Sequence, residues 1–321
     1  MSHPRAILLV QCADRPGLVA AMSSFLFRHG ANITDFDQHT SEAGGQMKPA
    51  PPGPPLAPGQ AATPGPALAA QGAQGAQGAQ AGTYFCRVEF QTDRLDLPLA
   101  DLEKAFEFDV ARPCQMTWRL TLSDKRKKVA LLVSKHDHAL LELLWSWKRG
   151  DLRADVTTVV SNHPDLREAV AAFGVPFVHV PNSAASRPEA ESRMAEVIGQ
   201  VDLVVLARYM QIVSPEFIAR WPERIINIHH SFLPAFVGAD PYRQAYERGV
   251  KVVGATAHYV TAELDAGPII EQDVARVSHR DSVESLKSLG RDLERRVLAR
   301  AVRWHCEDRV LVHGNKTVVF S

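Results

Sequence analysis

Short, wholly apolar runs that alternate with helical segments are the feature that most constrains the fold of this chain. The apolar runs cover residues 129–133, 156–160, 177–180 and 203–206, and the helical segments between them cover residues 138–147, 164–173 and 188–198. Strands that are apolar on both faces and alternate with helices are typical of a parallel sheet covered on both sides. We therefore expect an α/β domain with a mostly parallel sheet over residues 125–321, and its chemistry on loops that leave the carboxyl ends of the strands.

Residues 1–124 follow a different pattern, in which strands and helices have the order β-α-β-β-α-β. Strands are expected over residues 6–12, 32–40, 84–91 and 116–122, and helices over residues 18–29 and 101–110. In the first helix Leu18, Met22, Phe25 and Leu26 repeat at helical spacing, and Gly30 follows as its C-terminal stop. The pattern predicts a small α/β domain ahead of the larger one.

The motif Asp-Arg-Pro-Gly-Leu at residues 14–18 and Gly-Ala-Asn-Ile at residues 30–33 make this first half resemble an ACT domain. ACT domains are small ferredoxin-like units that often sense amino acids or form dimers. The resemblance implies a ligand near Gly17 and Asn32, an amino-acid effector such as methionine or glycine, and a homodimer or homotetramer. From the residues alone, Gly17 also fits a tight turn and Asn32 also fits a strand end.

A low-complexity segment rich in Pro, Gly, Ala and Gln, residues 44–82, separates the two middle strands of this domain. It holds few large apolar side chains, so burial could not offset the entropy lost on ordering, and we expect it to be disordered. An exposed hairpin tip tolerates such an insertion because loop-closure entropy grows only logarithmically with length. A partner-binding arm is the alternative.

The charge balance and the cysteines restrict the possible partners and compartment. Lys and Arg together number 36, as do Asp and Glu, which argues against a basic surface for nucleic acid or membrane. The apolar runs are too short to cross a bilayer, and the N-terminus lacks the features of a signal peptide. The four scattered cysteines fit free thiols. We expect a cytoplasmic protein that binds neither nucleic acid nor membrane.

The first strand of the parallel sheet ends in residues 134–138, Ser-Lys-His-Asp-His, instead of a glycine-rich loop. This ending argues against phosphate binding by bare backbone amides. His136, Asp137 and His138 could suggest a metal site, but adjacent residues at a helix start point in different directions. We interpret them as polar helix caps and expect no metal.

The densest group of chemically active side chains lies in residues 227–234 and 254–270. Asn227 and His229 follow a short strand over residues 224–226 and share one face, whereas His230 is expected on the other face. Asp265 follows later, after a helix over residues 241–248. Each residue alone could be a turn former or a core group.

Together, an amide, an imidazole and a carboxylate supply an oxyanion donor, a second donor or proton carrier, and a base. This set suits acyl or formyl transfer through a tetrahedral intermediate. A covalent triad is disfavoured because the chain has no serine or cysteine in a nucleophile elbow.

The Asn-x-His pair and the Leu-Asp-Ala-Gly-Pro motif at residues 264–268 closely resemble the active-site motifs of the folate-dependent formyltransferase family. The resemblance implies a Rossmann-like sheet and a catalytic trio of Asn227, His229 and Asp265. His258 is expected either beside the trio as a supporting residue or as a buried structural histidine. It also implies that the backbone of one segment binds the pteridine ring of the folate. That segment consists of Arg208, Tyr209, Met210, Gln211, Ile212 and Val213.

The reaction implied by the resemblance is hydrolysis of 10-formyltetrahydrofolate by water to formate and tetrahydrofolate. The bulky residues 135–138 stand where amine-formylating relatives hold a phosphate, so water can replace the amine. Folate is then the substrate, no metal or other cofactor is needed, and the reaction balances the one-carbon pool and supplies formate for purine synthesis. Two alternatives stay open, a glycinamide ribonucleotide formyltransferase and a non-catalytic folate or amino-acid sensor. Asp240 departs from the expected pattern near the folate tail.

Overall fold

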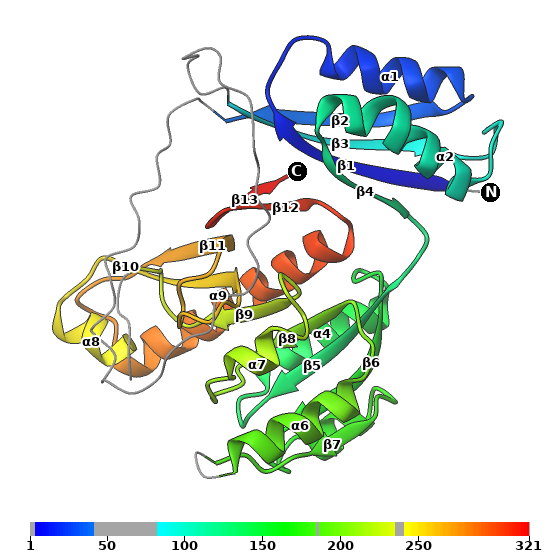
Figure 1. Cartoon of the computed structure of the whole chain (residues 1–321). Helices are drawn as coiled ribbons and strands as arrows, with labels where there is room; N and C mark the ends of the chain where they lie inside the picture. Colours follow the sequence, from blue (N-terminus) through cyan, green and yellow to red (C-terminus); the bar gives the residue numbers. More distant parts are fainter. Residues whose placement is uncertain (1–3, 42–81, 184–185, 235–240, 321) are drawn as a thin grey trace, which may run out of the picture.

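The computed structural model describes residues 4–41, 82–183, 186–234 and 241–320. The low-complexity segment predicted over residues 44–82 lies outside the described residues except for Gly82, and Asp240 lies outside them as well. Figure 1 shows two sheets, each with its own helices, and a small C-terminal hairpin between them. None of the helices in the described residues is long and apolar enough to span a membrane.

The first sheet has four antiparallel strands in the order β2-β3-β1-β4. Its elements are β1 (Arg5–Ala13), α1 (Leu18–Arg28), β2 (Asn32–Thr40), β3 (Thr83–Gln91), α2 (Leu99–Phe106), the π-helix η1 (Glu107–Ala111), α3 (Arg112–Cys114) and β4 (Thr117–Leu122). Helices α1 and α2 lie on one face of the sheet (Figure 1). Met22 and Phe25 of α1 are fully buried in the core of this domain. The predicted β-α-β-β-α-β order is confirmed, but the second helix is divided into three segments.

The second sheet has seven strands in the order β11-β10-β9-β8-β5-β6-β7. Its elements are β5 (Lys127–Val133), α4 (His138–Arg149), β6 (Ala154–Ser161), α5 (Arg167–Ala171), β7 (Phe177–His179), α6 (Arg187–Ile198), β8 (Leu203–Leu206), α7 (Pro215–Ile218), β9 (Ile225–His229), α8 (Pro241–Glu247), β10 (Val252–Tyr259), β11 (Ile269–Arg276) and α9 (Val283–Cys306). Strands β7, β6, β5, β8 and β9 are parallel, and β10 and β11 add an antiparallel edge. The predicted α/β class with a mostly parallel sheet is confirmed.

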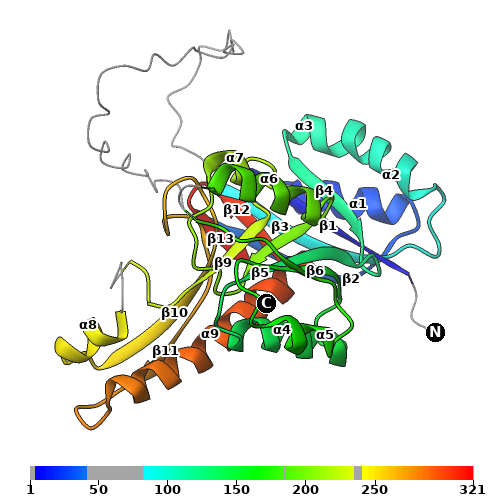
Figure 2. The ribbon, with the colours of Figure 1, turned by 90° about the horizontal axis from the view of Figure 1, so that it is seen from below.

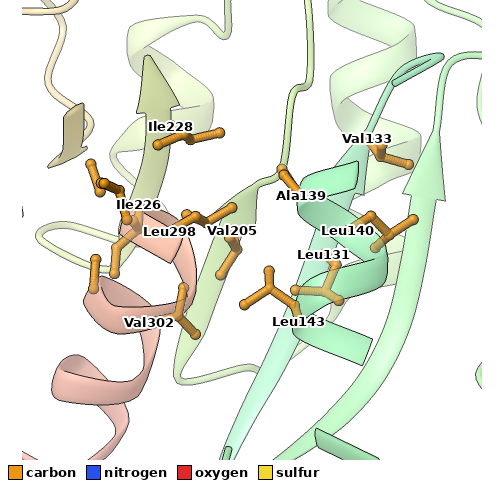
Figure 3. Close-up of a cluster of buried hydrophobic side chains, with 14 of the residues drawn as sticks. Leu131, Val133, Ala139, Leu140, Leu143, Val205, Ile226, Ile228, Leu298 and Val302 are labelled. Atoms are coloured by element: carbon orange, nitrogen blue, oxygen red, sulfur yellow. The ribbon is translucent and has the colours of Figure 1, made fainter. Parts of the chain in front are cut away.

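Helices cover both faces of this sheet, which explains why its strands are wholly apolar. Leu131 and Val133 of β5 belong to the core beneath α4 and α9 (Figure 3), whereas Ala130 and Leu132 belong to the core beneath α6 and α7. Figure 2 shows these two helix layers on opposite sides of the strands. Each residue of the run is therefore buried on one side or the other.

The C-terminal segment joins the two sheets, and it was not predicted from the sequence pattern. After α9 the chain forms a hairpin of β12 (Val310–His313) and β13 (Lys316–Val319). The hairpin lies on the side of the first sheet away from α1 and α2 (Figure 1). Phe320, which follows it, packs with Ile7, Leu9 and Phe85 of the first sheet. The last residues of the chain thus complete the burial of the first sheet.

Asp308, in the turn between α9 and β12, is the polar centre of this junction and is 5% exposed. Its carboxylate accepts a hydrogen bond from Thr121 Oγ1 (2.9 Å) and pairs with Lys127 and with Arg119 Nη2 (3.0 Å). Its backbone carbonyl accepts a bond from Arg87 Nε (3.3 Å). Burial raises the pKa of Asp308, but the charges of Lys127 and Arg119 outweigh burial, so its pKa lies below the ordinary value.

Asp308→Asn should lower the free energy of unfolding by roughly 3 kcal/mol at neutral pH, because it leaves the largely buried Lys127 without its counter-ion. The lowered pKa means that the carboxylate stabilises the fold fully above about pH 4 and loses this effect as the pH falls further. The difference between variant and wild type should therefore shrink in acid. Denaturant unfolding at several pH values measures it. Asp35→Asn is the control, since that carboxylate is 57% exposed and should contribute less than about 1 kcal/mol.

Candidate active site

A pocket with a volume of about 490 Å³ opens near the carboxyl ends of β8 and β9. Its wall includes Asn227 and His229 from β9, His258 from β10, and Asp265 from the loop between β10 and β11. All six residues of the predicted folate segment, residues 208–213, line the same pocket. The structure therefore brings together the predicted trio and the predicted folate segment.

The loop that carries Asp265 is held in an uncommon conformation. Asp265 has φ 54°, in the left-handed region that few residues other than glycine adopt. Two residues later, a Cβ on Gly267 would lie 1.8 Å from the carbonyl oxygen of Tyr259, so only glycine fits there. The Leu-Asp-Ala-Gly-Pro motif is thus required to turn the carboxylate back toward β9 and β10.

Asp265 lies between two imidazoles. His229 Nδ1 is 3.2 Å from one carboxylate oxygen, and His258 Nε2 is 3.5 Å from the other. Hydrogen bonds from His229 and then His258 hold the pKa of Asp265 well below its ordinary value, although burial acts in the opposite direction. The carboxylate is therefore ionised at neutral pH. Its strongest interaction is with His229, whose ring it orients and polarises.

The hydrogen bonds fix how the two imidazoles and the amide face each other. His258 Nδ1 donates to the carbonyl of Tyr259 (2.9 Å), and its Nε2, which faces Asp265, also lies 3.3 Å from Asn227 Nδ2. At most one N–H of that amide is directed at His258. This leaves the second N–H of the Asn227 amide for another acceptor. His229 directs Nδ1 to Asp265, and its Nε2 is buried without a hydrogen bond to any residue in the described ranges.

His230 does not take the position expected from strand alternation. It lines the same pocket, and its ring stacks on His229 with centroids 5.1 Å apart and 26° between the planes. The expectation of an opposite face was wrong because β9 ends at His229, so alternation stops before His230. Burial, followed by the charge of Arg208, lowers the pKa of His230 to about 4 and keeps the ring neutral.

Ser134 supports the backbone of the predicted folate segment, a role that was not predicted from the sequence. Its N–H donates to the carbonyl of Arg208 (3.2 Å), and its hydroxyl accepts from the N–H of Met210 (2.9 Å). The hydroxyl in turn donates to Asn162 Oδ1 (2.7 Å). Ser134 and Asn162 are both buried. Their placement at the ends of adjacent parallel strands, β5 and β6, is the signal that could have identified them.

Ser134→Ala should raise KM for the expected folate substrate by roughly tenfold while changing kcat much less, because it removes the acceptor of the Met210 N–H in the predicted folate segment. Steady-state kinetics separate the two parameters. Ser146→Ala on α4, remote from this pocket, is the control and should change neither. A lower kcat at unchanged KM would contradict a role in holding the folate segment.

The residues His136 to His138, which were predicted as polar helix caps, do not cap α4 with their side chains. Asp137 stands at the N-cap position of α4 but makes no side-chain capping bond, so that prediction was wrong. His138 Nε2 instead contacts Glu294 Oε2 of α9 at 2.8 Å. Within the described ranges, no three His, Cys, Asp or Glu side chains are grouped so that they could hold a metal ion.

The two residues predicted as an ACT ligand site have simple local roles in the first sheet. Gly17 precedes α1 with φ 92°, a turn conformation suited to glycine. Asn32 begins β2, and its amide donates to Gln91 Oε1 of β3 (3.0 Å). A role for either residue in ligand binding stays a prediction.

Comparison with known proteins finds a family match for each of the two parts of the chain. The family described as "Formyl transferase" matches residues 127–302, and the family described as "ACT domain" matches residues 6–48. A formyltetrahydrofolate deformylase from Bacillus subtilis is 48% identical over 98% of this chain and 93% of its own length. Another, from Synechocystis, is 44% identical over the full length of both chains.

Solved structures distinguish between two kinds of relative. A formyltetrahydrofolate deformylase from Pseudomonas syringae superposes with a TM-score of 0.85 and 42% identity, covering 100% of this chain and 96% of that chain. Glycinamide ribonucleotide transformylase 1 from Symbiobacterium toebii gives a TM-score of 0.57 and 34% identity, covering 61% of this chain and 95% of that chain. The transformylase thus matches only part of this chain, whereas the deformylase matches both sheets. The chain belongs to the formyltetrahydrofolate deformylase family.

Proposed function

We propose that this protein is a hydrolase that converts 10-formyltetrahydrofolate and water to formate and tetrahydrofolate. The observation that carries the proposal is the convergence of Asn227, His229, His258 and Asp265 on a pocket lined by the folate segment. The reaction would balance the one-carbon folate pool and supply formate for purine synthesis. Folate enters as the substrate, and each proposed step uses side chains of this chain alone.

In the proposed mechanism, the Asp265–His229 pair removes a proton from water. Asp265 accepts the Nδ1–H of His229, which leaves Nε2 to take the proton as the water oxygen bonds to the formyl carbon. The second N–H of Asn227 donates to the oxyanion that forms, and His258 keeps that amide in place. His229 then returns the proton to the folate nitrogen as the C–N bond breaks. Tetrahydrofolate and formic acid are formed, and the acid loses its proton to water to give formate.

The experiment that tests this function is incubation of the purified protein with 10-formyltetrahydrofolate and no acceptor. We expect formate and tetrahydrofolate to appear in equal amounts, at a rate that glycinamide ribonucleotide does not increase. A strict requirement for glycinamide ribonucleotide would identify a formyltransferase instead. Folate binding without any turnover would identify a sensor.

The ACT domain suggests regulation by an amino acid, and we propose methionine or glycine as the effector, acting in a homodimer or homotetramer. The proposal is supported by contacts that connect the first sheet to the pocket. Thr121 of β4 bonds to Asp308, Lys127 bonds to both Asp308 and the carbonyl of His305, and His305 Nδ1 bonds to the hydroxyl of Tyr259 (2.7 Å). Tyr259 adjoins His258.

Addition of the effector should shift the folate KM or the turnover by an amount equivalent to about 1–3 kcal/mol. Titration of methionine and glycine during the formate-release assay measures it. Asp308→Asn should weaken the response, because it removes bonds that connect β4 to the C-terminal turn. Flat responses to all the common amino acids would leave the ACT domain as an assembly unit.

A further inference from the structure

The side chain of Arg208 departs from the folate segment and enters a buried polar cluster behind the pocket. The centre of this cluster is Glu294 of α9, which is 1% exposed. Its carboxylate accepts from Tyr242 Oη (2.8 Å), contacts His138 Nε2 (2.8 Å) and lies 3.4 Å from Arg208 Nε. We call Arg208, Glu294, His138 and Tyr242 the Glu294 cluster. Arg208 has φ 64°, so the backbone is held in an uncommon conformation where this side chain begins.

The hydrogen-bonding capacity of Arg208 is not used up by this cluster. Its contact to Glu294 is long, whereas His138 and Tyr242 approach the same carboxylate closely. Nε and Nη1 of Arg208 are enclosed and make no hydrogen bond to residues 4–41, 82–183, 186–234 or 241–320. Leaving a buried guanidinium N–H group unpaired is unfavourable. Nε at least faces Glu294, whereas Nη1 favours an acceptor that the described part of the chain does not provide.

Arg208 also supplies positive charge to the wall of the pocket. Of the described residues that line it, Arg208 is the one Lys or Arg, and its side chain keeps 10% exposure. His136 and His230 both have lowered pKa values, first through burial and then through the charge of Arg208. These two imidazoles are therefore neutral near it. Asp265 and Arg208 thus place opposite charges on the pocket wall, with the ionised Glu294 carboxylate balancing part of the charge of Arg208.

We propose that the Arg208 guanidinium, with the neutral His230 ring beside it, forms a subsite for formate. This inference rests on the proposed hydrolysis, which produces formate next to Asp265. A planar guanidinium matches a planar carboxylate through paired N–H···O bonds, a match that neither a spherical anion nor a lysine reproduces. Repulsion from the ionised Asp265 and attraction to Arg208 would draw the product away from the catalytic trio. The enclosure of Arg208 restricts the ligand class to small monoanions.

Formate binding can be measured without turnover, by calorimetry on the full chain and by the effect of added formate on tetrahydrofolate release. Arg208→Gln should weaken formate binding by roughly tenfold or more, because it removes charge-assisted hydrogen bonds. Arg208→Lys keeps a cation beside Glu294 and should still lose the preference for formate and nitrate over chloride. Arg300→Gln is the matched control, since Arg300 of α9 pairs with Asp273 of β11 and does not line this pocket. Thermal unfolding and folate binding confirm that each variant is folded.

Equal formate affinity in wild type, Arg208→Gln and Arg208→Lys would overturn the subsite, as would wild-type protein that binds formate no better than chloride. In both cases the wild-type protein would still release formate from 10-formyltetrahydrofolate, so the proposed function would stand. If formate binds as expected but the folate is not hydrolysed, the proposed function fails instead.

Discussion

Asp265→Asn is expected to fold normally and bind the folate substrate, yet to lose roughly two to four orders of magnitude in the rate of hydrolysis. Asparagine has nearly the same shape and tolerates the left-handed conformation at this position, where φ is 54°. It cannot, however, carry the negative charge that orients and polarises His229 across 3.2 Å. The loss should therefore fall on kcat rather than on KM.

Formate release under saturating substrate measures this effect. Glu263→Gln is the control, since Glu263 is an exposed carboxylate in the same loop and should leave the rate unchanged. If Asp265→Asn keeps near-normal turnover, Asp265 is only a turn former ahead of Gly267, and the mechanism proposed for the pair is wrong.

Asn227→Ala should lower turnover by roughly a hundredfold to a thousandfold, because it removes one donor to the oxyanion. The variant should fold, since Asn227 is only half-buried and its amide bonds to His258 alone among the contacts seen in the described residues. His258 would lose a partner but keep its bond to the carbonyl of Tyr259.

The double variant of Asn227 and Asp265 provides a stricter test than either alone. Both residues act on the same tetrahedral intermediate, so their losses should combine to less than the product of the two single effects. Rates of hydrolysis for the wild type, the two single variants and the double variant give the interaction between the two residues. Fully multiplicative losses would mean that the two residues act in separate steps.

The elements that the sequence predicted correctly are those with strong local signals. The strands of the parallel sheet are apolar on both faces because each is covered twice, as Leu131 and Leu132 show by facing different cores. The convergence of Asn227, His229 and Asp265 on one pocket was predictable because the first two share a strand face and Asp265 stands in a distinctive turn motif. Their catalytic roles stay a prediction.

The parts that were missed depend on contacts between distant segments. Glu294 lies in α9 with no neighbouring motif, and its partners His138 and Tyr242 come from two other helices. The hairpin of β12 and β13 is short, and it is placed by packing against the first sheet. His230 was misplaced because the end of a strand, which decides the direction of its ring, is poorly determined by local sequence.

The most direct test of the central claim is to follow the oxygen atom that enters formate. The wild-type protein is incubated with 10-formyltetrahydrofolate in water enriched in oxygen-18, without any amine acceptor, and the formate is analysed by mass spectrometry. Direct attack of water on the formyl carbon predicts formate with one solvent oxygen, released together with tetrahydrofolate and strongly reduced in Asp265→Asn. A folate that stays formylated until an amine is added, with the formyl group then found on that amine, would contradict the account.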